Sequence, residues 1–134
     1  MGFLNKLQPV GLLVLRVALG VVMAVHGWQK IHSGPGHFVQ MVQGLGLPGW
    51  MAYLAIAAEF GGGILLIVGL VTRIAAAAVL IDMVVAISKV HLHNGLTGKG
   101  GFELPLSLAA IAFALIFFGG GAISVDWLIG SRGK

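Results

Sequence analysis

Apolar residues run almost without interruption through four long stretches of the chain, and the breaks between them are short and rich in glycine or proline. Each stretch is close to the roughly 20 residues that a helix needs to cross the hydrocarbon core of a bilayer. The pattern therefore predicts an all-α protein, an integral membrane four-helix bundle whose consecutive helices run antiparallel. The expected spans are about 9–31, 49–70, 74–91 and 103–121.

A shorter apolar pattern lies between the first two expected spans. Phe38, Met41, Val42 and Leu45 recur at helical spacing over residues 37–45. This segment is too short to cross the membrane, so we expect it to lie along the surface as a short interfacial helix.

The composition agrees with a membrane protein. The chain is 58% hydrophobic and 9% charged, with a mean hydropathy of +1.03, whereas an ordinary soluble domain carries roughly 25% charged residues. Little chain is left for a second unit, so residues 1–134 are interpreted as one domain embedded in a lipid bilayer. Cysteine is absent, which excludes disulfides, thiol redox chemistry and cysteine-ligated iron–sulfur or zinc sites built by this chain alone.

The net charge of +4 comes from bases that are scattered singly along the chain. That distribution is typical of anchors at the ends of membrane helices and not of nucleic-acid binding. The first apolar run is expected to be a retained helix and not a cleaved leader, because Arg16 interrupts it and no convincing small-residue cleavage motif follows.

The bases also predict an orientation. One side of the membrane would hold Lys6, Arg73, Arg132 and Lys134, and the other Lys30, Lys89 and Lys99. Because Lys30 and Lys89 lie on helix ends, the count over the free loops favours both termini in the cytoplasm.

Several ionisable residues fall inside the expected spans, where a charge is costly, with estimates that start at about 2.5 kcal/mol. Glu59 lies near the middle of the second span, Asp82 near the middle of the third, and Arg16 in the inner half of the first. Toward the outer side gather His26, Lys30, Lys89, His91 and Glu103. If these faces all turn inward, the bundle has a polar interior that opens toward the outer interface.

Two interpretations of these residues stay open. In a structural one, Arg16 pairs with Glu59 on the neighbouring antiparallel helix and only fixes register, while Asp82 caps a basic neighbour. In a functional one, the same groups line a cavity, which is the default expectation for ionisable residues inside a membrane. The run Gly61–Gly63 directly after Glu59 would let a neighbouring helix or a flat ligand approach closely.

The histidines give a weak signal for a metal. A lone histidine on an apolar helix is more often bonded to a neighbour than to a metal, so no metal site is predicted. A haem held between His26 and His91 stays an open alternative. The sequence contains no hydrolase triad, phosphate-binding loop or dinucleotide motif.

Taken in order, short motifs along the chain resemble those of the DoxX family of small four-helix bacterial membrane proteins. They are Arg16-Val-Ala-Leu-Gly20, His26-Gly-Trp-Gln-Lys30, Gly46-Leu-Pro48, Glu59-Phe-Gly-Gly-Gly63, Gly69-Leu-Val-Thr-Arg73, Lys89-Val-His91, Gly101-Phe-Glu103 and Ser124-Val-Asp126. The resemblance covers nearly all of residues 13–127 and implies a protein of the bacterial cytoplasmic (inner) membrane linked to respiratory or thiol-stress redox chemistry. Because the family takes its name from subunits of a thiosulfate:quinone oxidoreductase and terminal oxidase, it also implies a quinone-facing subunit.

The main hypothesis is therefore a membrane subunit of a redox system that binds quinone or quinol in a polar cavity. His26 and Lys30, or Lys89 and Glu103, would bond the two carbonyl oxygens. Glu59 or Asp82 would pass protons. Arg16 and His91 would complete the polar wall.

The alternative is a non-catalytic scaffold that docks a soluble redox or detoxification enzyme or another membrane subunit. Passage of a small solute or ion, in a homo-oligomer, is a third hypothesis. A cavity that reaches Glu59 favours the quinone hypothesis, whereas a closed, ion-paired core favours the scaffold.

Overall fold

The computed structural model describes residues 1–132, and this part of the chain is helical, with short connections and no strand. Lys134, which entered the charge count above, lies outside the described residues. The helices are α1 (Gly2–Lys6), α2 (Gln8–His32), α3 (Pro35–Gly44), α4 (Met51–Ile56), η1 (Ala57–Gly61), α5 (Gly62–Val68), α6 (Thr72–Ala86), η2 (Ile87–His91), η3 (Leu92–Asn94), α7 (Glu103–Phe118) and α8 (Val125–Arg132). The elements η1 and η2 are π-helical turns and η3 is a 3₁₀ turn. The predicted all-α membrane bundle is confirmed.

Three helical segments are long and apolar enough to cross a membrane: Gln8–His32, Met51–Val68 and Thr72–Asn94. The fourth, α7, has only 16 residues, or about 24 Å at 1.5 Å per residue, less than the roughly 30 Å of hydrocarbon in a typical bilayer. The expected fourth span of 103–121 was too long. Gly119 has a φ of 72° and ends the helix at Phe118.

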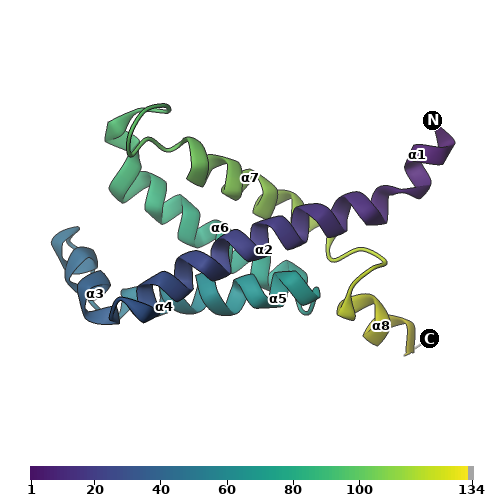
Figure 1. Ribbon diagram of the computed structural model, residues 1–134, viewed down its shortest axis with the longest axis horizontal. Helices are drawn as coiled ribbons and strands as arrows, with labels where there is room; N and C mark the ends of the chain where they lie inside the picture. The colour runs from purple at the N-terminus through teal and green to yellow at the C-terminus, as the bar shows by residue number, and fades with distance from the viewer. Residues whose placement is uncertain (133–134) are drawn as a thin grey trace.

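Figure 1 shows α2 crossing the molecule diagonally, with α5 along one side of it and the α6–α7 hairpin on the other. The short helix α3 occupies the place where the sequence predicts an interfacial helix. We call the end of the bundle that holds α3 and the α6–α7 connection the loop end. The opposite end holds α1 and α8 and is called the terminal end (Figure 1).

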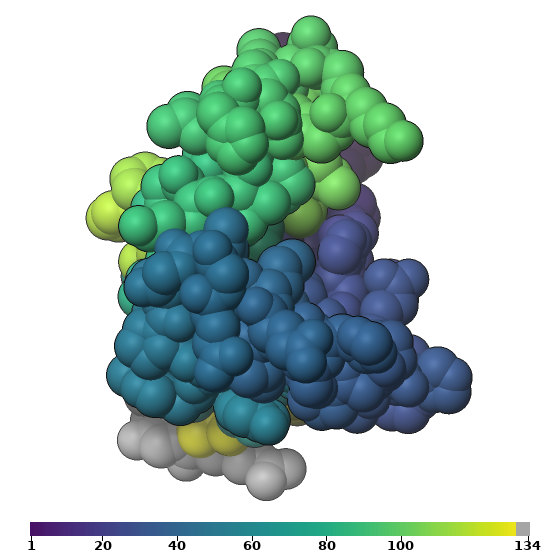
Figure 2. All heavy atoms as spheres, turned by 90° about the vertical axis from the view of Figure 1, so that its left-hand side faces the viewer, coloured from purple at the N-terminus to yellow at the C-terminus, as the bar shows by residue number. Residues whose placement is uncertain are grey.

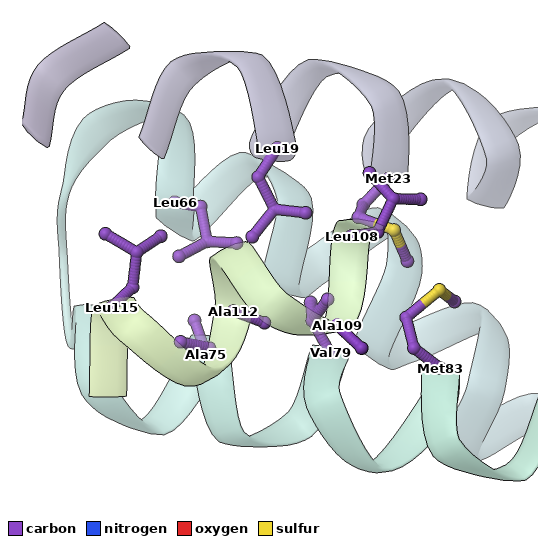
Figure 3. Packing of buried hydrophobic residues seen from close by; sticks show 11 residues of the cluster. Leu19, Met23, Leu66, Ala75, Val79, Met83, Leu108, Ala109, Ala112 and Leu115 are labelled. Atoms are coloured by element: carbon purple, nitrogen blue, oxygen red, sulfur yellow. The ribbon is translucent and has the colours of Figure 1, made fainter. Parts of the chain in front are cut away.

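The spans meet in a core of small and branched apolar side chains (Figure 3). Leu19, Leu66, Val79, Ala112 and Leu115 come from four different helices and are at most 1% exposed. Because lipid tails are as apolar as these side chains, close packing holds such helices together more than exclusion of water does.

Glycines bring the backbone of α2 into direct contact with the second span. A Cβ added to Gly63 would lie 2.6 Å from the backbone nitrogen of Ala24 and 2.7 Å from the carbonyl oxygen of Gly20. A Cβ on Gly27 would lie 2.5 Å from the backbone nitrogen of Phe60. The close helix approach that the glycine run was expected to permit is therefore present at Gly63.

Arg16 joins two helix ends at the terminal end. This side chain is only 2% exposed. Its Nε donates to the carbonyl oxygen of Leu66 at 2.7 Å, and a terminal guanidinium nitrogen donates to the carbonyl oxygen of Gly120. The suggested pair between Arg16 and Glu59 is wrong, because the last carbonyls of α5 lack partners within their own helix and take the guanidinium instead.

Asp126 caps the start of α6. Its two carboxylate oxygens accept the backbone N–H of Val71 at 2.7 Å and of Thr72 at 2.9 Å. Val71 has a φ of 43°, which is rare for a β-branched residue, so these bonds hold a strained turn. Partial burial acts to raise the pKa of Asp126, but the hydrogen bonds from Thr72 and Val71 and the charge of Arg16 outweigh it and lower the pKa below its usual value.

Replacing Gly63 by leucine is expected to lower the melting temperature in detergent, because the new side chain must push α2 away. Overpacking of this kind costs about 3 kcal/mol at the upper end of its usual range. Gly11→Leu is the matched control, since a Cβ at Gly11, also within a spanning helix, meets no atom within 4 Å. Equal melting temperatures for the two variants would contradict the backbone contact.

Asp126→Asn is expected to weaken the cap by about 1 kcal/mol at neutral pH, because one of the two acceptor oxygens is lost. The lowered pKa of Asp126 means that its contribution is fully present above the unfolded value of about 3.9 and is lost as pH falls through the folded value. Unfolding in detergent from pH 7 downward should therefore show a shallower loss of stability below about pH 4 in the variant. Parallel curves for the variant and the native protein would count against this role.

Candidate functional site

Figure 1 shows α4 and the last turns of α6 diverging toward the loop end. A wide cavity is lined by residues of these two segments. Its volume is about 1190 Å³ and most of its wall is apolar. Figure 2 looks onto this end of the molecule, with α3 and α4 in blue and the segment from η2 to the start of α7 in green. The cavity extends inward to Glu59 and Asp82, in the middle of their spans.

The cavity gathers residues that lie far apart in the sequence. Of the eight predicted site residues, its wall contains Glu59, Asp82, His26, Lys30, Lys89, His91 and Glu103. Arg16 is not among them, because it serves the helix ends at the terminal end of the bundle. The ionisable groups are thus divided between a structural cluster at one end and a cavity at the other.

An ion pair between Lys30 and Glu59 forms the inner wall. The Lys30 Nζ and a Glu59 carboxylate oxygen are 2.6 Å apart, and the two side chains are 24% and 7% exposed. Lys30 lies near the end of α2, and its side chain turns into the bundle toward this carboxylate. Its ammonium also lies 4.8 Å from the centre of the Phe38 ring, a cation–π contact that ties α3 to the pair.

Asp82 faces the same pair from α6. Its carboxylate interacts electrostatically with both Glu59 and Lys30. One of its oxygens, Oδ2, is buried and has no hydrogen-bond partner among the described residues. A buried oxygen of this kind costs free energy unless a ligand or water satisfies it. Asp82 is therefore a carboxyl group of the cavity wall with one oxygen that the described residues leave unsatisfied.

Of the remaining polar residues, Lys89, His91 and Glu103 lie toward the loop end of the cavity, whereas His26 precedes Gly27, which packs on Phe60, and so lies at about the depth of Glu59. The ring Nδ1 of His26 is 2.7 Å from the carbonyl oxygen of Val22, and the ring Nδ1 of His91 is 2.8 Å from that of Gly100. Lys89 and Glu103 are exposed on the rim.

No three His, Cys, Asp or Glu side chains come together as a metal site within residues 1–132. Each of the two histidines has one ring nitrogen bonded to a backbone carbonyl. Haem at His26 and His91 stays an untested prediction.

Two π-helical turns supply cavity residues. Glu59 lies in η1, and Lys89 and His91 lie in η2. A π-helical turn inserts an extra residue into the helix, shifts the face that later side chains present, and is often found at functional sites. The sequence predicts neither turn, because apolar periodicity changes little when a single residue is inserted in a fully apolar helix.

The role of Phe38 in the cavity was also not evident from the sequence. Its helical spacing with Met41 and Val42 predicts the interfacial helix, and all three line the cavity. The sequence does not distinguish the apolar residues of the cavity wall from residues that face lipid, because both are hydrophobic.

The geometry combines the Lys30–Glu59 pair with the neighbouring carboxyl group of Asp82 in a mostly apolar cavity. Lys30 can donate a hydrogen bond to a carbonyl oxygen, and Asp82 can accept one when ionised or donate one when protonated. Such an arrangement can hold a flat ligand with two oxygen atoms and exchange a proton with it.

Comparisons with known proteins agree with these features. A model of the DoxX family matches residues 11–92, more than half of the chain. The chain is 37% identical over 112 residues to CatD of Bacillus subtilis, with 84% of this chain and 83% of that protein covered. The name of that relative designates it an oxidoreductase on a provisional basis. It is 31% identical to the inner membrane protein YqjF of Escherichia coli, with 96% and 99% covered.

The chain is also 31% identical to the uncharacterized membrane protein Rv3486 of Mycobacterium tuberculosis, with 92% of this chain and 84% of that protein covered. No solved structure matches the chain significantly. The family match, the identities and the helical membrane fold agree, and the chain belongs to the DoxX family.

Proposed function

We propose that this DoxX protein is the membrane subunit of a redox system and binds quinone or quinol in the cavity. The observation that carries the proposal is the Asp82 carboxyl group, whose Oδ2 has no hydrogen-bond partner among the described residues, beside the Lys30–Glu59 pair in the middle of a mostly apolar cavity. A quinone ring has two carbonyl oxygens that require donors and two faces that require apolar contact. The oxidoreductase designation of the B. subtilis relative also supports a redox function.

Each polar group has a defined task in this proposal. Lys30 donates to one carbonyl oxygen of the quinone while Glu59 holds the ammonium in place at 2.6 Å. Asp82, in its protonated form, donates to the other oxygen. Reduction to quinol takes up two electrons from a partner redox enzyme and two protons, and Asp82 delivers the first proton to the carbonyl oxygen that becomes a hydroxyl. Glu103 and His91 at the mouth relay protons from the aqueous side.

The location of the protein follows from the same proposal. The relatives named as membrane or inner membrane proteins support the bacterial cytoplasmic membrane. The terminal end would face the cytoplasm and the loop end the outer side, in line with the distribution of lysine and arginine. A soluble redox enzyme or a second membrane subunit would supply the electrons.

A scaffold without quinone binding is the second candidate function. The Lys30–Glu59 pair favours it, because a buried ion pair can fix helix register without doing chemistry. In that case the polar groups would only hold the helices in place for a docked enzyme.

Asp82→Leu is expected to weaken quinone binding by about tenfold, because leucine cannot donate the hydrogen bond, which contributes about 1.5 kcal/mol or more. Binding is measured by titrating quinone into the purified protein in nanodiscs. The native protein should also carry co-purified quinone in a lipid extract.

Asp126→Leu is the matched control for this experiment, because it makes the same change at the other end of the bundle. It should lower the melting temperature and leave the dissociation constant for quinone unchanged, whereas Asp82→Leu should raise the dissociation constant without lowering the melting temperature. Native protein that binds no quinone would leave the scaffold as the better hypothesis.

Glu59→Gln is expected to lower the melting temperature, because it leaves the Lys30 charge without its partner; breaking a buried pair costs about 3 kcal/mol. Lys30→Met combined with Glu59→Gln should recover most of this loss and still fail to bind quinone. A double variant that binds quinone normally would show that the pair has no part in recognition.

A further inference from the structure

The cavity is larger than a quinone ring requires. Its volume of about 1190 Å³ exceeds the roughly 300–1,000 Å³ of ordinary small-molecule sites. Its wall follows α6 and η2 from Ile74 to Lys89, a distance of about 20 Å at the helical rise per residue. Glu59 and Asp82 lie between these limits, so a ring bound to them leaves a long part of the cavity to be filled.

The part on the terminal-end side of Glu59 and Asp82 contains no polar side chain. We call it the inner arm, and its wall is made by Gly61, Gly62, Leu65, Ile74, Ala75 and Ala78. The opposite part, toward the loop end, carries the ionisable side chains of the mouth. The cavity is therefore amphipathic along its length, with its polar centre in the middle and an apolar arm on one side only.

The glycine run shows how the inner arm stays open. The three consecutive glycines face three different surroundings: Gly63 lies against the α2 backbone, and a Cβ on Gly62 would lie 3.5 Å from a Val79 methyl group. A Cβ on Gly61 would meet no atom within 4 Å, although Gly61 belongs to the cavity wall. The space beside Gly61 is thus free. Ile74, at the far end of the arm, is 71% exposed on a membrane-spanning helix.

We infer that the ligand is a membrane-resident amphiphile, whose polar ring lies at Asp82 and the Lys30–Glu59 pair and whose apolar chain lies in the inner arm. The chain passes Gly61 and Ala78 and leaves the protein beside Ile74 into the lipid. This inference rests on the proposed quinone site and deepens it, because it selects quinones with a long chain over small water-soluble ones.

Physical chemistry supports a chain in this arm over water. An apolar enclosure offers a water molecule no hydrogen-bond partners, and such spaces stay dry or take up apolar ligands. The chain also has a reason to follow this direction, because the other direction leads past Lys89, His91 and Glu103, where an apolar chain would desolvate charged groups.

Gly61→Leu tests the inference. A Cβ at this position meets no atom within 4 Å, so we expect the leucine side chain to extend into the arm and to exclude a chain but not a ring. Binding is measured in nanodiscs with two probes: a ubiquinone analogue with a decyl chain, and a chain-free analogue with the same ring substituents. The variant should bind the decyl analogue about tenfold more weakly, since overpacking costs a few RT or more. It should bind the chain-free analogue within about twofold of the native value.

Gly11→Leu is the matched control, because it also adds a leucine to open space on a spanning helix but lies outside the cavity. It should change neither affinity. If Gly61→Leu leaves the decyl analogue unaffected, or weakens both analogues equally, the chain does not occupy the inner arm and the inference is overturned while the quinone site stands. If the native protein binds neither analogue, the quinone site and the inference fail together.

A photoreactive group at the end of the decyl chain tests the direction independently. Cross-links are expected on Leu65, Ala78 or Ile74 of the native protein. Cross-links confined to the mouth near Lys89 would overturn the assignment of the chain to the inner arm.

Discussion

Contact between the backbones of α2 and the second span is the constraint on which the arrangement of this protein depends. It is possible only because Gly20, Gly27 and Gly63 have no side chains at the crossing. Close approach at these points fixes both the depth and the rotation of α2, and it brings Lys30 within 2.6 Å of Glu59. Without a hydrophobic effect between helices in lipid, packing of this kind is the main source of specificity. The ion pair is then a consequence of the helix contact as much as a cause of it.

The ionisable residues serve two separate purposes at the two ends of the bundle. At the terminal end, Arg16 and Asp126 satisfy backbone groups that helices leave unpaired. Arg73 does the same at the C-terminus of α7, where it donates to the carbonyl oxygens of Ile116 and Phe117 at 2.8 Å. At the loop end, the charges instead face an open cavity. A binding site between helices requires helices that are held in register at one end and separate at the other. The terminal end and the loop end of this bundle meet these two requirements.

The two π-helical turns connect the fold to the site. Both occur where a spanning helix passes the cavity, and each carries ionisable residues of the wall. Glu59 in η1 pairs with Lys30 of α2 and lies in the cavity wall. Four residues later, Gly63 packs against the α2 backbone. One short segment thus serves both helix packing and the cavity.

The sequence by itself determined the class of protein, the number and order of the apolar helices and the short helix before the second span, since these depend on local hydropathy and on glycine and proline breaks. It also identified which ionisable residues lie inside the membrane, because charge in an apolar run is conspicuous. Which groups meet was decided only by tertiary structure. Arg16 and Lys30 both lie on α2 and either could in principle approach Glu59. The rotation and depth of α2 against the second span, which depend on the glycine contacts between the two backbones, bring Lys30 to Glu59. The end of α7 at Phe118, the π-helical turns and the volume beside Gly61 likewise depend on backbone geometry and packing, which hydropathy does not encode.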